Sequence, residues 1–502
     1  MSRSLPFASC VDATDTKSNS APALTLLQLP PELLRRIMLL TMNSHPSPTH
    51  HQHSHQTFIN AANPRELHNG IALAFTCTTM LNIFRTSLTA VKLVSSWQNH
   101  QHTLLSICKI AATTLRAIHL ECSSPVSPAL KHLLSQPPPI RHFVLIGVNI
   151  SKRLLNDLLQ TLGHTFHKLV ISAAPSLDHI TVQIIARSCT ALRYLELAGS
   201  RHVTARSLIQ VFEHLGPNLR GLELNALHHP SLDDQVLFAA ATHCNRLTYL
   251  CLLRLTWVAD LGLQTFFKQA AHHLTRFHLH SCVNTTVHAL CALDHYASAL
   301  ETLFFSLHTD RINCPPRVLT SPSSRLDLSP TCTLTESIQP SAFTLPEQPL
   351  LRNTKRSQNL RAFSLSQLPL SDHILQPISR ACGETLRFLS LCNCPGLTDA
   401  TLLSLAKNLK SLTTLDISYN SSLTDHGIST VLATMPNNLE QLHVISCKGL
   451  TDTLLRTVIP NFARRLRIIR LSYCDFSIPA IEAVKASLPL LELHGSSIAF
   501  FY

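Results

Sequence analysis

Glycine and charge are both scarce in this sequence. Its 502 residues include 12 glycines, and charged residues make up 14% of the chain. There is no glycine-rich phosphate-binding loop, no cluster of paired carboxylates and no His-Glu-x-x-His motif, so we expect a chain that is not an enzyme and needs no cofactor or metal. No run of 18 apolar residues occurs, and the N-terminal segment has no apolar core of signal-peptide length. We therefore expect a soluble protein of the cytoplasm or nucleus, without a membrane partner.

A repeat dominates the second half of the chain. Four segments of the form Leu-x-x-apolar-x-apolar begin at Leu386, Leu412, Leu439 and Leu466. The first three are followed by Leu-Thr-Asp and then by apolar residues at helical spacing. A strand, a turn, a helix and a return within about 26 residues are typical of leucine-rich repeats. The pattern predicts an α/β fold, a right-handed solenoid shaped like a horseshoe with a parallel sheet on its concave side.

The same spacing extends through most of the chain. Fourteen positions qualify as the first apolar residue of a repeat: Leu115, Ile140, Phe166, Leu192, Leu219, Leu247, Leu274, Leu300, Leu360, Leu386, Leu412, Leu439, Leu466 and Leu488. The interval of 60 residues between Leu300 and Leu360 indicates an insertion, and residues 309–358 are rich in proline and serine. We expect the array to occupy 97–308 and 359–502, with 309–358 as a disordered excursion that leaves the stack intact.

Two further positions recur in each repeat. Thr398, Thr424 and Thr451, with the aspartates that follow them, are placed to cap the starts of helices. Eight residues after the first leucine stand Cys394, Asn420, Cys447 and Cys474, and side chains of this kind suit a tight turn with buried backbone groups. The 16 cysteines are therefore expected to be reduced, and the repeat already accounts for Cys394 of the Cys392-x-Cys394 pair.

The region before the array has a different pattern. Residues 1–22 are polar and predicted to be disordered, whereas 23–96 contain two apolar helical patterns separated by a histidine-rich loop at 45–60. The five histidines at 45–55 are more simply interpreted as a solvated loop than as a metal site. A Leu-Pro-x-Glu-Leu-Leu-x-x-Ile run begins at Leu29, and a second apolar segment ends near Cys77.

These two segments resemble an F-box. The resemblance implies a small all-α domain that binds a Skp-type adaptor and, through it, the cullin and RING subunits of an SCF ubiquitin ligase. The residues implied to bind the adaptor are Leu29, Pro30, Glu32, Leu33, Ile37, Leu73 and Cys77. The array would then bind the target protein. The alternative is a leucine-rich scaffold or inhibitor without a ligase role, similar to regulators of mitotic exit, which Met80 and the long loop after Leu40 favour.

The concave sheet is the expected binding face. Side chains between the strand leucines point away from the core, and their mixture of aromatic, arginine and histidine residues is enriched in protein interfaces. We expect the target to contact Tyr194, Glu196, Glu223, Tyr249, Arg276, His278, His280, Phe304, Phe388, Asp416, His443 and Arg470. The net charge is +12. Because no block of more than three Lys or Arg residues occurs, the positive charge is spread along the sequence, and we expect no nucleic-acid partner. A basic solenoid that binds RNA on its concave face is the third and weakest alternative.

Overall fold

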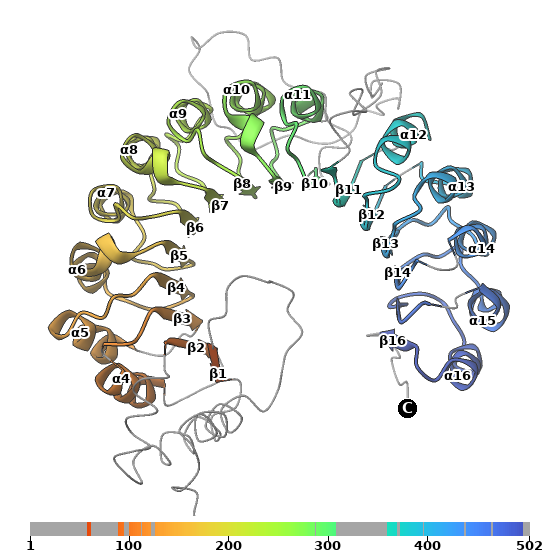
Figure 1. The fold of residues 1–502 in the computed structure, drawn as a ribbon, viewed down its shortest axis with the longest axis horizontal. Helices are drawn as coiled ribbons and strands as arrows, with labels where there is room; N and C mark the ends of the chain where they lie inside the picture. The colour runs from red at the N-terminus through yellow and green to blue at the C-terminus, as the bar shows by residue number, and fades with distance from the viewer. Residues whose placement is uncertain are drawn as a thin grey trace, which may run out of the picture.

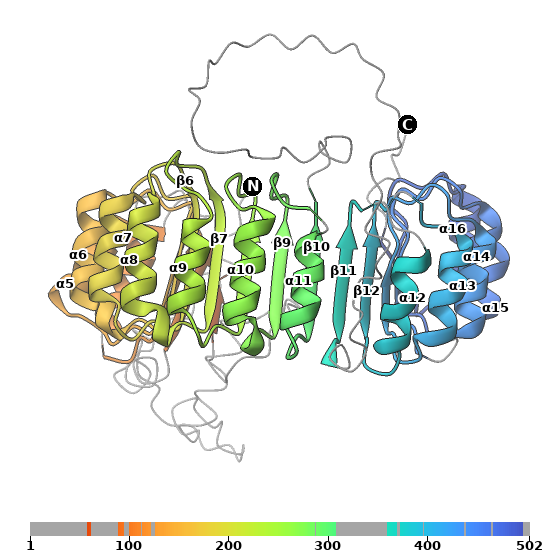
Figure 2. The same ribbon diagram turned by 90° about the horizontal axis from the view of Figure 1, so that it is seen from above.

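Strands and helices alternate along the chain and form one curved stack. The protein is represented by a computed structural model that describes residues 58–61, 89–94, 100–111, 113–121, 126–286, 288–307, 359–368, 372–394, 396–435, 438–462 and 465–494. The strands line the inner side of the arc and the helices its outer side (Figure 1). Viewed from above, neighbouring strands and helices stand roughly parallel to one another along the whole arc (Figure 2).

A single sheet of 16 strands runs through the stack in sequence order. Each strand pairs in parallel with the strands before and after it. The strands are β1 Phe58–Ala61, β2 Ala90–Val94, β3 Ala117–Glu121, β4 His142–Ile146, β5 Lys168–Ser172, β6 Tyr194–Ser200, β7 Gly221–Leu227, β8 Tyr249–Leu253, β9 Arg276–His280, β10 Thr302–Ser306, β11 Ala362–Ser366, β12 Phe388–Cys392, β13 Thr414–Asp416, β14 Gln441–His443, β15 Ile468–Arg470 and β16 Glu492–His494.

Helices return the chain from one strand to the next. They are α4 His100–Ile110, α5 Ser127–Ser135, α6 Lys152–Leu162, α7 His179–Ser188, α8 Ala205–Leu215, α9 Gln235–His243, α10 Asp260–Ala270, α11 His288–Tyr296, α12 Asp372–Ala381, α13 Asp399–Asn408, α14 Asp425–Thr434, α15 Ile459–Phe462 and α16 Ile478–Ser487. Short 3-10 turns follow three of them, at η2 Gly163–Thr165, η3 Gly216–Asn218 and η4 Ala271–His273. A π-helical turn, η8 Leu454–Val458, leads directly into α15.

The core lies between the sheet and the helices. In one central repeat Leu219, Leu222 and Leu224 are all 0% exposed. Burial of each such side chain stabilises the fold by about 1.5–3 kcal/mol. The predicted solenoid is confirmed, since thirteen of the fourteen predicted first positions lie two residues before a strand. In the last repeat the register instead pairs Ile469 with Leu493, so the first position falls on Leu490 and not on the predicted Leu488.

The sheet starts earlier than the sequence analysis placed it. Strands β1 and β2 both lie within 23–96, the range assigned to an all-α F-box-like domain, and β1 overlaps the histidine-rich loop at 45–60. Both strands continue the parallel ladder, and β2 pairs with β3 from Ala90 to Val94. Leu88, Val91 and Leu93 have the spacing of the repeat, and Val91 and Leu93 are fully buried. The array therefore begins before the predicted boundary at residue 97.

The long interval between Leu300 and Leu360 does not interrupt the sheet. Strand β10 pairs with β11 over five residues, from Thr302 with Ala362 to Ser306 with Ser366. The stack therefore continues directly across the predicted insertion at 309–358, which lies outside the described residues.

The side chains at the recurring turn position pair with buried backbone groups, as the sequence predicted, and they also link neighbouring repeats. The Asn420 amide donates to the carbonyl oxygens of Leu391 at 2.7 Å and Ile417 at 2.8 Å, and its oxygen accepts from the Cys394 amide at 2.8 Å. Cys447 occupies the equivalent site, and its thiol lies 3.3 Å from the Ile417 carbonyl oxygen. These side chains satisfy buried carbonyl groups of the preceding repeat, which would otherwise carry a desolvation cost.

The Leu-Thr-Asp motif has a second function besides capping. The Thr424 and Thr451 hydroxyls cap their own helices by accepting from backbone amides two residues later. In addition, the aspartate of one repeat binds the cap residue of the next. Asp425 accepts from the Thr451 amide at 3.0 Å and from its hydroxyl at 2.5 Å, and Asp399 accepts in the same way from Thr424. The motif thus fixes the spacing between helices along the outer edge of the stack.

Candidate functional site

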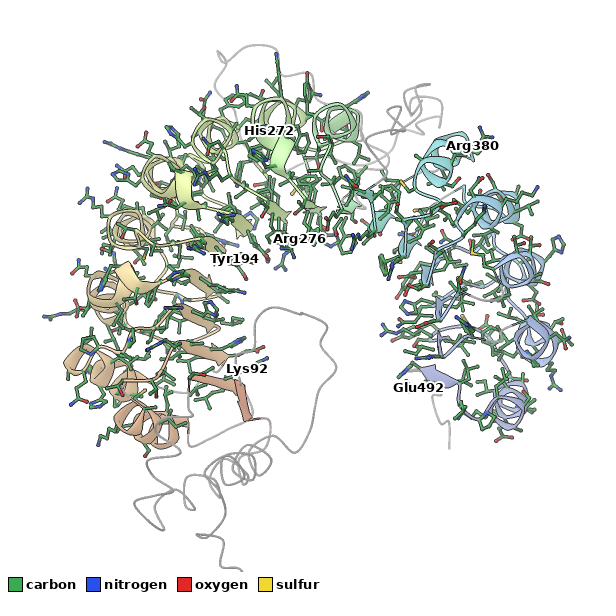
Figure 3. The ribbon with its side chains drawn as sticks, in the orientation of Figure 1. Lys92, Tyr194, His272, Arg276, Arg380 and Glu492 are labelled. Atoms are coloured by element: carbon green, nitrogen blue, oxygen red, sulfur yellow. The ribbon has the colours of Figure 1, made fainter. Side chains whose placement is uncertain are left out.

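All twelve side chains predicted to bind the target lie on the concave face. They occupy the first, third or fifth positions of their strands, where they alternate with buried leucines. Tyr194 and Arg276 are seen on the inner side of the arc in Figure 3. The seven residues implied to bind an adaptor, Leu29, Pro30, Glu32, Leu33, Ile37, Leu73 and Cys77, lie outside the described residues.

A stack of two aromatic rings between two cations occupies the centre of this face. The sheet register aligns Lys168, Tyr194, Gly221, Tyr249 and Arg276 in one row across five strands. The two tyrosine rings are 6.0 Å apart and nearly parallel. The Lys168 Nζ lies 4.6 Å from the centre of the first ring, and the Arg276 Cζ lies 5.2 Å from the centre of the second. Both rings are therefore held by cation–π contacts on their outer sides.

Gly221 makes this stacking possible. It lies in the row between the two tyrosines, and a Cβ atom at this position would stand 2.5 Å from the Cδ2 of Tyr194. Only a residue without a side chain leaves room for the rings to approach each other across the intervening strand.

Both tyrosine hydroxyls converge on one carboxylate. The hydroxyls of Tyr194 and Tyr249 each lie 3.1 Å from the Oε2 atom of Glu223 and donate to it. Burial, followed by the negative charge of Glu223, raises the pKa of Tyr194 far above its usual range. Burial is also the largest cause of the raised pKa of Tyr249. Both phenols therefore stay protonated as donors.

The Glu196 carboxyl titrates near neutrality. Burial, and then the charge of Glu223, raises its pKa to about 7, despite the opposing effects of Lys168 and Tyr194. Its Oε2 atom lies 3.4 Å from the Tyr194 hydroxyl. Glu196 therefore exchanges its proton close to pH 7.

An aromatic series continues from the tyrosines towards the second half of the array. The Tyr249 and His278 rings meet edge to face at 5.4 Å, and His278 stacks on Phe304 at 4.6 Å. Phe304 and Phe388 lie 5.7 Å apart, although strand β11 separates their strands. We call the series Tyr194, Tyr249, His278, Phe304 and Phe388 the aromatic ladder. Burial, and then the charge of Arg276, lowers the pKa of His278 to about 4, so this ring is neutral.

The C-terminal part of the concave face is polar. Asp416 accepts from the Ser418 amide at 3.1 Å and hydroxyl at 2.6 Å, and its Oδ2 lies 3.9 Å from the Nδ1 of His443. Burial alone would raise the pKa of Asp416, but the hydrogen bonds from His443 and Ser418 lower it. Arg470 follows in the same row at the next strand. Asp416, His443 and Arg470 thus give this arm charge and hydrogen-bonding groups.

No grouping with catalytic geometry was found in the part of the chain that the structure describes. Cysteines there are free, and burial raises the pKa of buried thiols such as Cys189, Cys251 and Cys394 to about 12, which keeps them unreactive. Within the same residues, no three His, Cys, Asp or Glu side chains are grouped to hold a metal ion. None of the described helices has the length and apolarity to cross a bilayer.

The sequence analysis missed two members of the site. Lys168 and Gly221 occupy the same strand position as Tyr194 and Tyr249. Lys168 and Gly221 both stand two residues after the first apolar position of their repeats, so the repeat pattern could have located them. The role of Gly221, however, follows only from the size of the tyrosines beside it in the sheet.

The comparisons with known proteins give weak but consistent similarities. No protein-family model matches the sequence. It is 24% identical over 336 residues to the DNA repair protein rhp7 of Schizosaccharomyces pombe, covering 66% of this chain and 53% of that protein. It is 30% identical over 102 residues to F-box/LRR-repeat protein 17 of Arabidopsis thaliana, covering 20% of this chain and 16% of that protein. The chain therefore spans about half of the first relative and less than a fifth of the second.

A solved structure has a similar fold. A chain of the crystal structure of the Rad7 and Elc1 complex in yeast superposes with a TM-score of 0.50 at 15% identity, covering 79% of this chain and 87% of that one. The fold is that of a leucine-rich repeat solenoid. At this level of identity the likeness concerns the fold alone.

Proposed function

We propose that this chain is the target-recognition subunit of a cullin–RING ubiquitin ligase of the SCF type. The observation that carries the proposal is the aromatic ladder, whose two tyrosines are flanked by Lys168 and Arg276, on a concave face without catalytic groups among the described residues. Large aromatic and arginine side chains supply most of the binding energy in protein interfaces. The similarity to F-box/LRR-repeat protein 17 supports the ligase context.

In this function the chain contributes proximity. The solenoid would hold a target while the F-box-like segment binds an adaptor, and the conjugating enzyme would carry the activated ubiquitin. Holding the target's lysines near the thioester makes their attack effectively intramolecular, which accounts for large rate gains without a catalytic residue in the receptor. The Rad7 structure was solved as a complex with a second protein, Elc1, which supports a partner for the solenoid of this chain as well.

Charged substitutions in the F-box-like segment test the adaptor contact. Pro30→Asp combined with Leu33→Asp is expected to abolish co-purification of adaptor and cullin, because apolar contacts of the F-box helix would be lost. Leu261→Asp is the matched control, since this leucine is 64% exposed on α10 and should leave adaptor binding unchanged. Circular dichroism should show both variants folded. Adaptor binding that survives Pro30→Asp/Leu33→Asp would reject the proposal.

The target contact is tested separately. Phe304→Ala combined with Phe388→Ala should remove ubiquitinated targets from the co-purified material while adaptor and cullin remain, because an aromatic residue that acts as an interface hot spot contributes about 2 kcal/mol or more. Unchanged targets would place recognition elsewhere.

The alternative function, a scaffold that binds a partner without ubiquitination, uses the same concave face. It predicts that neither adaptor nor cullin co-purifies with the wild-type chain, so the first experiment also decides between the two functions.

A further inference from the structure

Basic side chains from five consecutive repeats form a row at the edge of the sheet where the strands begin. Each stands one residue before its strand, and the row is Arg116, Arg141, His167, Arg193 and Arg220. Backbone hydrogen bonds join the members directly: the amides of Arg141, His167, Arg193 and Arg220 donate to the carbonyl oxygen of the preceding member at 2.6–2.9 Å. We call this feature the basic row.

The cations of this row are available to a ligand. Arg141, Arg193 and Arg220 are exposed. Among the ion pairs between described residues, none includes a member of the row. The Arg116 guanidinium donates to the backbone oxygen of Thr113 at 3.2 Å. Among the described residues, four guanidinium groups therefore stand along one edge without an acidic partner.

Neighbouring side chains on the concave face add to the positive charge. Lys92 and Lys168 lie on strands β2 and β5, and two histidines lie between them. Burial, followed by the charges of Lys92 and Lys168, lowers the pKa of His119 to about 4. Burial and then Lys168, His167 and Arg141 lower the pKa of His142. Glu121, whose Oε2 is 3.8 Å from the His119 Nε2, is the acidic neighbour on β3.

The basic row is interrupted after Arg220 by three repeats without a cation at this position, and Arg361 and Arg387 occupy it in the next two repeats. At the same position of the following repeats stand Thr248, Thr275 and Glu301, each joined to its predecessor by the same backbone bond. Tyr194, the first ring of the ladder, follows Arg193 of the row directly in the chain. A ligand that runs along the sheet from β3 to β10 therefore meets the cations of the basic row first and the rings of Tyr249, His278 and Phe304 next.

We propose that the basic row binds an acidic stretch of the target protein whose apolar side chains rest on the aromatic ladder. Parallel strands are about 4.8 Å apart, so five positions span about 19 Å, the length of roughly six residues of extended peptide. Arginine forks bind carboxylates in pairs of hydrogen bonds. The inference rests on the proposed target-recognition function and adds the chemical class of the target.

A protein fits this surface better than a nucleic acid. Lys168 and Tyr249 already cover the two faces of the Tyr194 ring, so it offers no face to a base. The carboxyls of Glu196 and Glu223 next to that ring would repel a phosphate chain that continued past the row. A peptide avoids both problems because its acidic part can end at the row and an apolar part can follow.

The test uses the full-length chain and a fluorescent peptide of alternating glutamate and serine. Anisotropy should detect binding that weakens with salt. The variant Arg141→Ser/Arg193→Ser/Arg220→Ser is expected to lose about 10- to 100-fold in affinity, from three exposed ion pairs. The matched control Arg153→Ser/Arg187→Ser/Arg206→Ser removes three exposed arginines from the outer helices α6, α7 and α8 and should bind like the wild type.

Three outcomes would overturn the proposal: no binding by the wild-type chain, equal losses in the two triple variants, or duplex DNA of matched charge binding more tightly than the peptide through the same arginines. The last result would make the row a nucleic-acid site. Co-purification keeps the two proposals apart, because the row variant should still bring down adaptor and cullin. A wild-type chain that binds the peptide but no adaptor would reject the ligase function alone.

Discussion

Replacing Glu196 by glutamine should change how stability depends on pH. Burial and the nearby Glu223 charge raise the pKa of Glu196 from 4.5 to about 7 in the folded chain. Between these values the folded molecule keeps a proton that the unfolded chain releases, so stability is lost as pH rises from 4.5 to 7. A shift of this size corresponds to about 3 kcal/mol. Because the side chain is not fully removed from solvent, screening reduces the expected effect to about 1–2 kcal/mol.

Urea unfolding followed by circular dichroism at about pH 5 and about pH 8 measures this effect. Groups remote from Glu196 titrate alike in both proteins, so the difference between wild type and Glu196→Gln reports Glu196 and the groups coupled to it. Between about pH 5 and about pH 8, the free energy of unfolding of the variant should fall by about 1–2 kcal/mol less than that of the wild type. Glu213→Gln, at an exposed position of α8, should behave like the wild type. An identical pH dependence for Glu196→Gln would refute the description of the carboxyl cluster.

Two further predictions concern the bonds between repeats, and urea unfolding near pH 7 tests both. Asn420→Ala should destabilise the fold by about 2–4 kcal/mol, because the buried Leu391 carbonyl and the Cys394 amide lose the Asn420 side chain as their partner. Asn420→Cys should recover part of this loss, since Cys447 fills the equivalent site, and no recovery would contradict the equivalence. Asp425→Ala should lower the free energy of unfolding by about 1–2 kcal/mol, because the hydrogen bonds from Thr451 are lost. If the variant is as stable as the wild type, the Leu-Thr-Asp motif stabilises only its own helix.

The repeat itself was predictable because each unit buries the same few side chains. The leucines at first positions such as Leu219 and Leu386 recur at a nearly constant interval, which can be read directly from the sequence. The start of the array was missed because the resemblance of 23–96 to an F-box took precedence over the weaker spacing of Leu88, Val91 and Leu93. The last repeat deviates because Leu490 is 92% exposed, with no described repeat beyond it to provide a cover.

The site was predictable only in part, since it depends on neighbours across the sheet. Alternation along a strand places Tyr194 and Phe388 on the concave face, and this prediction needs no partner strand. The bond of two tyrosines to Glu223, the space left by Gly221 and the continuity of the basic row all join residues about 26 positions apart. Basicity that looks diffuse along the sequence becomes concentrated when the repeats are stacked.

Because β10 pairs directly with β11, the fold at this junction does not depend on how many residues connect the two strands. Because the two strands meet whatever joins them, and because the entropy of closing a longer connection grows only slowly with its length, residues can be gained or lost there without moving either half of the horseshoe. Natural variation, or a protein engineer adding a domain, therefore has a place in the middle of the chain where new sequence leaves the binding face in register.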